Sequence, residues 1–207
     1  MLITFSGSVG SGKSSFSRAL GAHLNENKYP FLNLRFRFLS WRKITKDVRT
    51  AKKCMPAGQP PGRPKKSRSQ LRSETKQTLG VRHFLGYALR MLNFKMLLRW
   101  KLKNTIAICD RYFYDNFAHY KLQSPVEVFL FGLLVRMMPK PDLAFLCKAN
   151  SETIIKRRNY KYAPDYLEAT TKSYGTLKTK FPDLLELDSD QPANSEQFMF
   201  EQFKYQA

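Results

Sequence analysis

The fold is decided by Gly7-Ser8-Val9-Gly10-Ser11-Gly12-Lys13-Ser14, which fits the pattern G-x-x-x-x-G-K-[ST] of a phosphate-binding Walker A loop. The apolar run at residues 1–6 precedes it and predicts a β-strand. Phe16, Leu20 and Leu24 follow at four-residue steps, which predicts a helix with one apolar face. In this order of strand, loop and helix, backbone N–H groups and the positive end of the helix dipole face a bound anion. We therefore predict a nucleotide site here.

Each part of the loop has an expected role. Gly7 and Gly12 let the backbone turn tightly, Lys13 reaches the β- and γ-phosphates, and the Ser14 hydroxyl ligates Mg²⁺. We therefore expect ATP and Mg²⁺ as cofactors. The residues expected to contact the nucleotide are Gly7, Ser8, Val9, Gly10, Ser11, Gly12, Lys13, Ser14 and Ser15.

Length and composition favour one globular α/β domain over residues 1–207, since 43% of the 207 residues are hydrophobic. No apolar stretch is long enough to span a membrane, and the N-terminus does not resemble a signal peptide. The three cysteines, Cys54, Cys109 and Cys147, are widely spaced and fit neither a disulfide framework nor a zinc motif. We expect a cytoplasmic protein with reduced thiols.

The positive charge is concentrated in one part of the chain. Residues 41–103 carry 18 Lys and Arg against only Asp47 and Glu74, a local net charge of +16 out of +20 for the whole chain. Within this part, residues 41–78 are rich in Pro, Gly, Ser, Lys and Arg, which predicts a mobile basic insertion without a core of its own. Such a segment could bind a nucleic acid, although aromatic residues for base stacking are missing from its most basic part.

Alternating strand and helix patterns follow the loop and predict a parallel sheet with helices on both faces. The further strands are expected at residues 31–36, 105–109, 143–147 and 184–188. The helices are expected at residues 79–102, 125–138, 152–158, 165–181 and 194–205.

Charged side chains cluster where two of these strands end. Arg35 and Arg37 lie at the end of the second strand, while Asp110 and Arg111 directly follow the third. Ligands of open parallel sheets bind beyond the carboxyl ends of the strands. Asp110 could hold Mg²⁺ through water, and Arg111 could bind a phosphate with two hydrogen bonds.

Four motifs in this order resemble the thymidylate kinase-like branch of the nucleoside monophosphate kinases. They are GSVGSGKSS at 7–15, CDRY at 109–112, PKPDLAFLCK at 139–148 and the arginine-bearing helix at 152–158. The resemblance implies a three-layer P-loop NTPase fold whose five parallel strands have the order 2-3-1-4-5. It also implies a possible homodimer through the helix at 79–102.

The resemblance extends to site residues. It implies that Arg111 binds the acceptor phosphate, together with Tyr112 beside it. It further implies a lid at about residues 152–165 that closes over ATP with Arg157 and Arg158. The residues expected to act in catalysis are Lys13, Asp110, Arg111, Arg157 and Arg158, and those expected to bind the acceptor are Arg35, Arg37, Arg111 and Tyr112.

The charges near the second strand bear on the acceptor. Transfer to a hydroxyl needs a carboxylate base, whereas a phosphate oxygen is already anionic near neutral pH. No carboxylate lies between Glu26 and Asp47, where Arg35 and Arg37 stand instead. We therefore expect a phosphate-bearing acceptor, such as the deoxynucleoside monophosphate dTMP.

Three alternatives remain open at this point. The chain could be a nucleic-acid-associated NTPase or a polynucleotide kinase that grips its substrate with residues 41–103. It could be a deoxynucleoside kinase, the nearest rival family. It could also bind ATP without turnover, for instance on an anionic membrane, although the intact Lys13, Ser14 and Asp110 argue against degeneration.

Overall fold

The computed structural model describes most of the chain. The described residues are 1–35, 81–101, 105–118, 120, 122–157 and 164–206. The expected basic insertion at 41–78, Arg37, Arg158 and the adjoining part of the expected lid lie outside them. Among the described helices, none is both long and apolar enough to cross a membrane.

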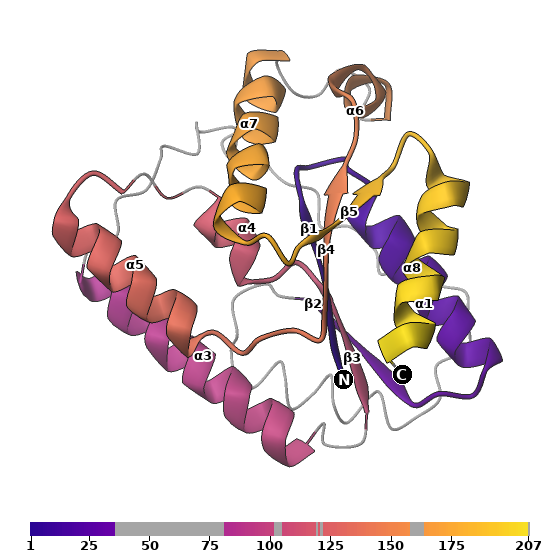
Figure 1. Cartoon of the computed structure of the whole chain (residues 1–207), viewed down its shortest axis with the longest axis horizontal. Helices are drawn as coiled ribbons and strands as arrows, with labels where there is room; N and C mark the ends of the chain where they lie inside the picture. Colours follow the sequence, from indigo (N-terminus) through magenta and orange to yellow (C-terminus); the bar gives the residue numbers. More distant parts are fainter. Residues whose placement is uncertain (36–80, 102–104, 119, 121, 158–163, 207) are drawn as a thin grey trace, which may run out of the picture.

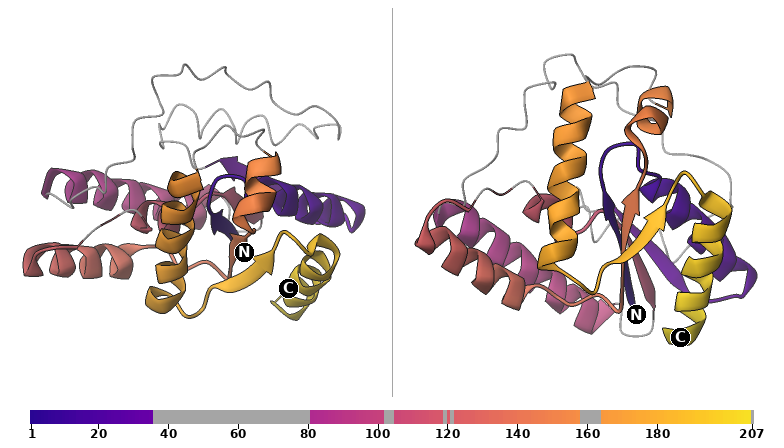
Figure 2. Two further views of the ribbon diagram at one scale, coloured as in Figure 1. Left: turned by 90° about the horizontal axis from the view of Figure 1, so that it is seen from above. Right: turned by 45° about the horizontal axis from the view of Figure 1, so that its top comes forward.

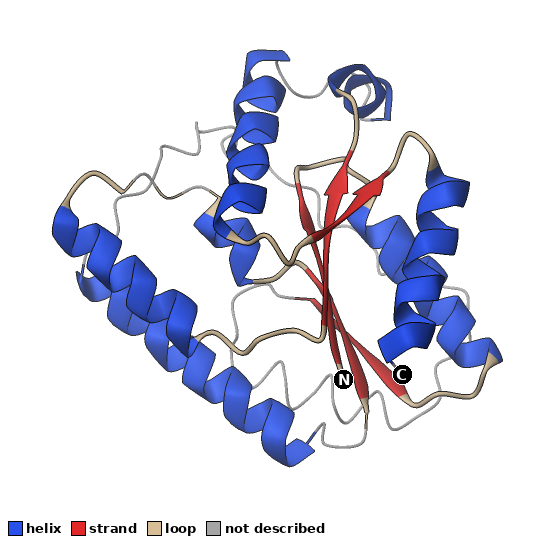
Figure 3. Ribbon diagram, in the orientation of Figure 1, coloured by secondary structure: helices blue, strands red, loops and turns tan. Residues whose placement is uncertain are grey.

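A five-stranded sheet forms the centre of the molecule (Figure 3). Its strands are β1 (Leu2–Gly7), β2 (Phe31–Arg35), β3 (Ile106–Asp110), β4 (Leu143–Lys148) and β5 (Leu185–Asp188). Their spatial order is β2-β3-β1-β4-β5, and every neighbouring pair is parallel. The expected fold class and strand order are therefore confirmed. All carboxyl ends lie at one edge of the sheet, which is where the glycine loop begins.

Helices cover both faces of the sheet (Figures 1 and 2). They are α1 (Lys13–Glu26), α3 (Val81–Lys101), α4 (Phe113–Phe117), α5 (Pro125–Met137), α6 (Ser151–Arg157), α7 (Pro164–Lys180) and α8 (Pro192–Gln206). One face packs on α1 and α8, and the other on α3, α4, α5 and α7. Helix α6 lies beyond the carboxyl end of β4 (Figure 1).

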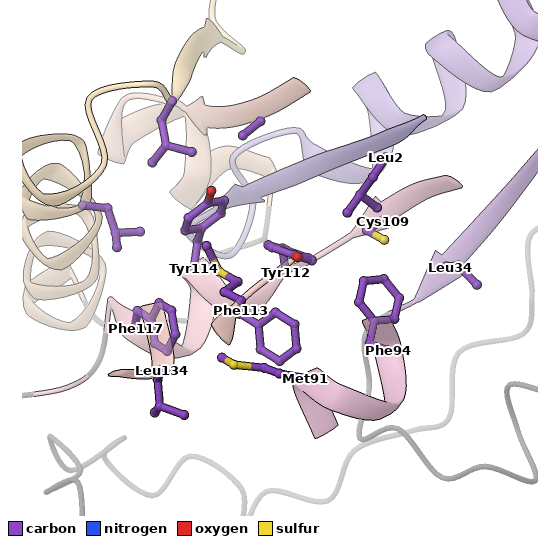
Figure 4. Packing of buried hydrophobic residues seen from close by; sticks show 14 of the residues in the cluster. Leu2, Leu34, Met91, Phe94, Cys109, Tyr112, Phe113, Tyr114, Phe117 and Leu134 are labelled. Carbon is purple, nitrogen blue, oxygen red and sulfur yellow. The ribbon is translucent and has the colours of Figure 1, made fainter. Parts of the chain in front are cut away.

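The two-residue period of β1 divides its side chains between two cores. Ile3 and Phe5 face the α1 side, while Leu2 faces the α3 side. Figure 4 shows the second core, where Phe94 of α3 packs edge-on against Tyr112 at the end of β3. Since every residue of β1 is buried, the strand is a rigid base for the loop that follows it.

The short helix α4 is an element that the sequence analysis did not anticipate. It begins directly after Tyr112, and the carboxylate of Asp115 accepts a hydrogen bond from the Tyr112 backbone N–H at 3.0 Å. This side-chain cap satisfies a backbone donor that the first turn of a helix leaves unpaired. The cap turns the chain immediately after β3 and brings Asp115 back toward the sheet edge.

Candidate functional site

The glycine loop fits between the ends of two other strands. At Gly7, where φ is +145°, an added Cβ would lie 2.3 Å from the carbonyl oxygen of Cys147 on β4. At Gly12, where φ is +83°, it would lie 2.6 Å from Oγ of Ser189, just after β5. A side chain at either position would therefore meet both a strained backbone and an occupied space. The two glycines are required by the fold around the loop.

Helix α1 begins at the loop without a cap of its own. Gly12 provides no side-chain cap, and the first turn contains no acidic residue. The amides at the start of a helix carry a partial positive charge and lack partners within the helix. This end of α1 is therefore suited to an anion such as a phosphate.

Lys13 lies inside the loop and is only 5% exposed. Its Nζ donates to the carbonyl oxygens of Gly7, at 2.7 Å, and of Ser8, and it lies 3.4 Å from Oγ of Ser11. Burial lowers the pKa of Lys13 to about 8, although the nearby carboxylate of Asp115 partly offsets that effect. The ammonium group is thus held at the centre of the loop by weak acceptors that a phosphate could replace.

Ser14 and Asp110 are brought together across the site. The hydroxyl of Ser14 donates a 2.8 Å hydrogen bond to Oδ2 of Asp110. A hydroxyl and a carboxylate are hard oxygen ligands, and Mg²⁺ binds one or two such groups together with water and substrate phosphates. The donor set therefore fits the expected metal ion.

Arg111 has a backbone conformation that is rare for a residue with a side chain. Its φ is +81°, and its N–H donates to the carbonyl oxygen of Phe5 at 3.0 Å. The left-handed conformation costs roughly 1–2 kcal/mol for an L-residue. Such residues concentrate at functional sites, where the surrounding contacts hold them in place. The Arg111 side chain is 40% exposed and lies near Gly7, where the glycine loop begins.

Asp115 joins three parts of the site, and the sequence analysis did not select it. Its Oδ1 accepts the Gly7 N–H at 3.3 Å and the Tyr174 hydroxyl of α7 at 2.7 Å. The same oxygen lies 3.7 Å from Nη1 of Arg111. With its second oxygen on the N–H of Tyr112, this buried carboxylate contacts β1, α4, α7 and the candidate acceptor arginine.

Arg157 reaches the loop through Ser189. Its Nη2 donates to the Ser189 carbonyl oxygen at 2.7 Å, and its Nη1 donates to the Ser189 hydroxyl. Because Ser189 lies against Gly12, the guanidinium is brought close to the start of α1. The sequence analysis named Arg157 but overlooked Ser189.

The structure places one expected acceptor side chain, that of Tyr112, in the core, and it does not describe the side chains of two others. Tyr112 is buried in the core, and its hydroxyl donates to the carbonyl oxygen of Pro139. Its ring packs among aromatic residues rather than beside the loop (Figure 4). The backbone of Arg35 pairs with Asp110 at the edge of the sheet, but its side chain lies outside what the structure describes. Arg37 and Arg158 lie outside the described residues.

A cavity of about 320 Å³ lies at the ends of β4 and β5, next to Ser189. Its lining residues are Lys148, Ala149, Asn150, Glu186, Leu187, Asp188 and Asp190. Lys148 and Glu186 form a 2.7 Å ion pair there, and Oδ2 of Asp190 accepts the Asn150 N–H at 2.7 Å. The ends of these two strands, and the turns that follow them, are thus held together on one side of the loop.

The two residues that were overlooked carried weak signals in the sequence. Asp115 stands four positions after Arg111, the spacing of side chains that meet on one helix face. Ser189 is the first residue after the last strand, at the sheet edge where ligands bind. Neither signal distinguishes a site residue from an ordinary turn residue without the fold.

Comparisons with known proteins support the fold and go no further. No model of a protein family matches the chain, and no curated protein matches it by sequence. The crystal structure of thymidylate kinase from Ehrlichia chaffeensis is similar, with a TM-score of 0.57. The two share 15% sequence identity over 99% of this chain and 98% of that one. At this identity the likeness shows the fold alone.

Proposed function

We propose that the chain is an ATP-dependent phosphotransferase that moves the γ-phosphate of ATP to a phosphate-bearing acceptor. The acceptor that we put first is a nucleoside or deoxynucleoside monophosphate such as dTMP. The observation that carries the proposal is the hydrogen bond between Ser14 and Asp110, which joins the glycine loop to the strand end that bears Arg111. Phosphate-binding and acceptor-binding groups then share one edge of the sheet.

The donor triphosphate would bind over the glycine loop. The Lys13 ammonium would exchange the carbonyl oxygens of Gly7 and Ser8 for the β- and γ-phosphates, while the first amides of α1 donate to the same group. Ser14 and Asp110 would hold Mg²⁺. When bound, that ion neutralises charge on the β- and γ-phosphates.

The carboxylates of the site support an acceptor that is already anionic. Of the two described carboxylates beside Arg111, Asp110 accepts a hydrogen bond from the Ser14 hydroxyl, and Asp115 is buried with donors on both oxygens. Neither is placed as a base for a neutral hydroxyl. Arg111, by contrast, offers a guanidinium that matches a phosphate. These features argue against the deoxynucleoside kinase alternative.

Arg157 is the described residue best suited to stabilise charge on the transferring group. Its guanidinium is held by Ser189 beside the start of α1, so little further ordering is needed when the nucleotide binds. The neighbouring cavity at the ends of β4 and β5 offers space for the nucleoside part of the donor. Arg158 remains a second candidate from the sequence.

The deciding experiment measures ATP consumption with Mg²⁺ across nucleoside monophosphates, the matching nucleosides and a single-stranded oligonucleotide. We expect turnover with a monophosphate and a loss of about 1,000-fold in Lys13→Ala. Lys172→Ala, an exposed lysine of α7, is the matched control and should keep the wild-type rate. Faster turnover of a nucleoside than of its monophosphate would overturn the proposed acceptor. Stimulation by the oligonucleotide alone would favour the nucleic-acid alternative.

We also propose that two copies of the chain associate through α3 and α5, which lie side by side (Figures 1 and 2). A row of apolar side chains on α3 is exposed at helical spacing: Leu85, Leu89, Leu92, Met96 and Trp100. Helix α5 adds Val126, Phe129 and Leu133, which are also exposed. An apolar surface of this kind marks an interaction site in a monomer.

A cytoplasmic location, where ATP is available and Cys109 and Cys147 stay reduced, accords with the proposed phosphotransferase activity.

A further inference from the structure

The carboxylate of Asp115 is buried at the junction of the phosphate loop, the strained Arg111 and helix α7. We propose that Asp115 is a positioning residue for phosphoryl transfer, and that Tyr174 is the contact through which α7 holds it. The kinetic part of this inference rests on the proposed function. A second part, that Asp115 and Tyr174 connect the loop to α7, depends only on the binding of ATP to the loop.

The contacts of Asp115 are all donors, and they come from separate elements. Oδ1 receives the N–H of Gly7, at the end of β1, and the hydroxyl of Tyr174, on α7. Oδ1 also lies within ion-pair distance of Arg111, and Oδ2 receives the N–H of Tyr112. A single rigid carboxylate thereby sets the distance between the loop and the candidate acceptor arginine.

These contacts require a carboxylate at position 115. Ionised Asp accepts on both oxygens, whereas Asn presents an NH₂ group to one set of partners. In Asp115→Asn, that NH₂ would face either the Gly7 N–H and Tyr174 hydroxyl or the Tyr112 N–H. The substitution keeps the shape of the side chain and breaks its pairing, so it tests the charge and not the volume.

A helix cap alone does not account for the arrangement. The cap of α4 uses only Oδ2, through the N–H of Tyr112. Oδ1 is directed instead toward Gly7 and Tyr174, which lie 108 and 59 positions away in the sequence. Burying a carboxylate is unfavourable unless its partners compensate, and here the partners are groups of the site.

The first test compares the kinetics of Asp115→Asn, Tyr174→Phe and the double variant. Because misplaced reacting groups lose rate, we expect kcat to fall about tenfold in Tyr174→Phe and about 100-fold in Asp115→Asn. The KM of the acceptor should change little, since no positive group is removed from the site. The double variant should match Asp115→Asn, because Tyr174 acts only through that carboxylate.

The control for this series is Tyr114→Phe. Tyr114 is a buried tyrosine of α4 whose ring packs on Phe181, so its variant also loses a tyrosine hydroxyl, at the position that precedes Asp115 in the chain. We expect its kcat to stay at the wild-type value. A lower melting temperature with unchanged kcat in the Asp115 and Tyr174 variants would show a merely structural role and overturn the proposal. Additive losses in the double variant would also overturn it.

The second test measures hydrogen exchange with and without MgATP. In the wild type, we expect MgATP to slow exchange both in the first turn of α1 and in α7. In Tyr174→Phe, the response of α7 should be lost while that of α1 remains. A response of α1 without one of α7 in the wild type would overturn the positioning role even if phosphate transfer is observed. Both responses without transfer to any acceptor would support the contact between the loop and α7 through Asp115 and would refute the proposed function.

Discussion

Ser14 and Asp110 are 96 positions apart in the sequence, yet the Ser14 hydroxyl donates to Oδ2 of Asp110 at 2.8 Å. The bond joins the first turn of α1 to the end of β3. The two meet because β1, which leads into the glycine loop and α1, lies beside β3, with Phe5 paired with Asp110. Two oxygen ligands suited to Mg²⁺ thus meet at the phosphate loop.

The first prediction concerns this pair. Ser14→Ala and Asp110→Asn should each raise the Mg²⁺ concentration needed for half-maximal activity and lower kcat about 100-fold, since each removes an expected oxygen ligand. Titration of activity with Mg²⁺ measures both effects. Glu201→Gln, an exposed carboxylate of α8, should leave the titration unchanged. An unchanged Mg²⁺ dependence in both site variants would place the metal elsewhere.

The second prediction concerns the loop glycines. Gly12→Ala should destabilise the protein by about 1–2 kcal/mol through its positive φ alone, and its Cβ would also press on Ser189. Gly175→Ala is the matched control in α7, where nothing lies within 4 Å of the added Cβ. That change should stabilise the helix by about 0.5–1 kcal/mol. Denaturant unfolding compares the two, and equal effects would contradict the packing around Gly12.

The third prediction uses the lowered pKa of Lys13. The pKa is about 8 in the folded protein against 10.5 as the ordinary value, so between these values the unfolded chain binds more protons. Stability of the wild type should therefore rise with pH in this window, relative to Lys13→Met, by about 3 kcal/mol at most. Unfolding free energies measured from pH 7 to 10.5 test the difference. Parallel curves would show that Lys13 is not buried as described.

The fourth prediction concerns self-association. Trp100 is 73% exposed on α3 and lies in line with Leu89, so Leu89→Lys and Trp100→Lys should convert a dimer into a folded monomer. Light scattering coupled to gel filtration measures the mass. Tyr205→Lys, which is 89% exposed on α8, should leave the mass unchanged. A monomeric wild type would refute the proposed homodimer.

The sequence by itself determined the glycine loop and the type of sheet. The loop between residues 7 and 14 is recognisable because its glycines, lysine and serine act within one continuous stretch of backbone. The strands could be predicted because each is a short apolar run between turns, and their alternation with helices requires parallel pairing. The resemblance then supplied the strand order, which the structure confirms.

Only the tertiary structure decided which side chains meet in the site. The stretch from Asp110 to Asp115 contains acidic, basic and aromatic residues, and its sequence does not say which of them turn toward the loop. The short helix α4 sends Tyr112 into the core and returns Asp115 to Gly7 and Tyr174. Likewise, Ser189 meets Gly12 and Arg157 only because β5 ends beside the loop. Such contacts depend on packing between distant segments, which local patterns do not encode.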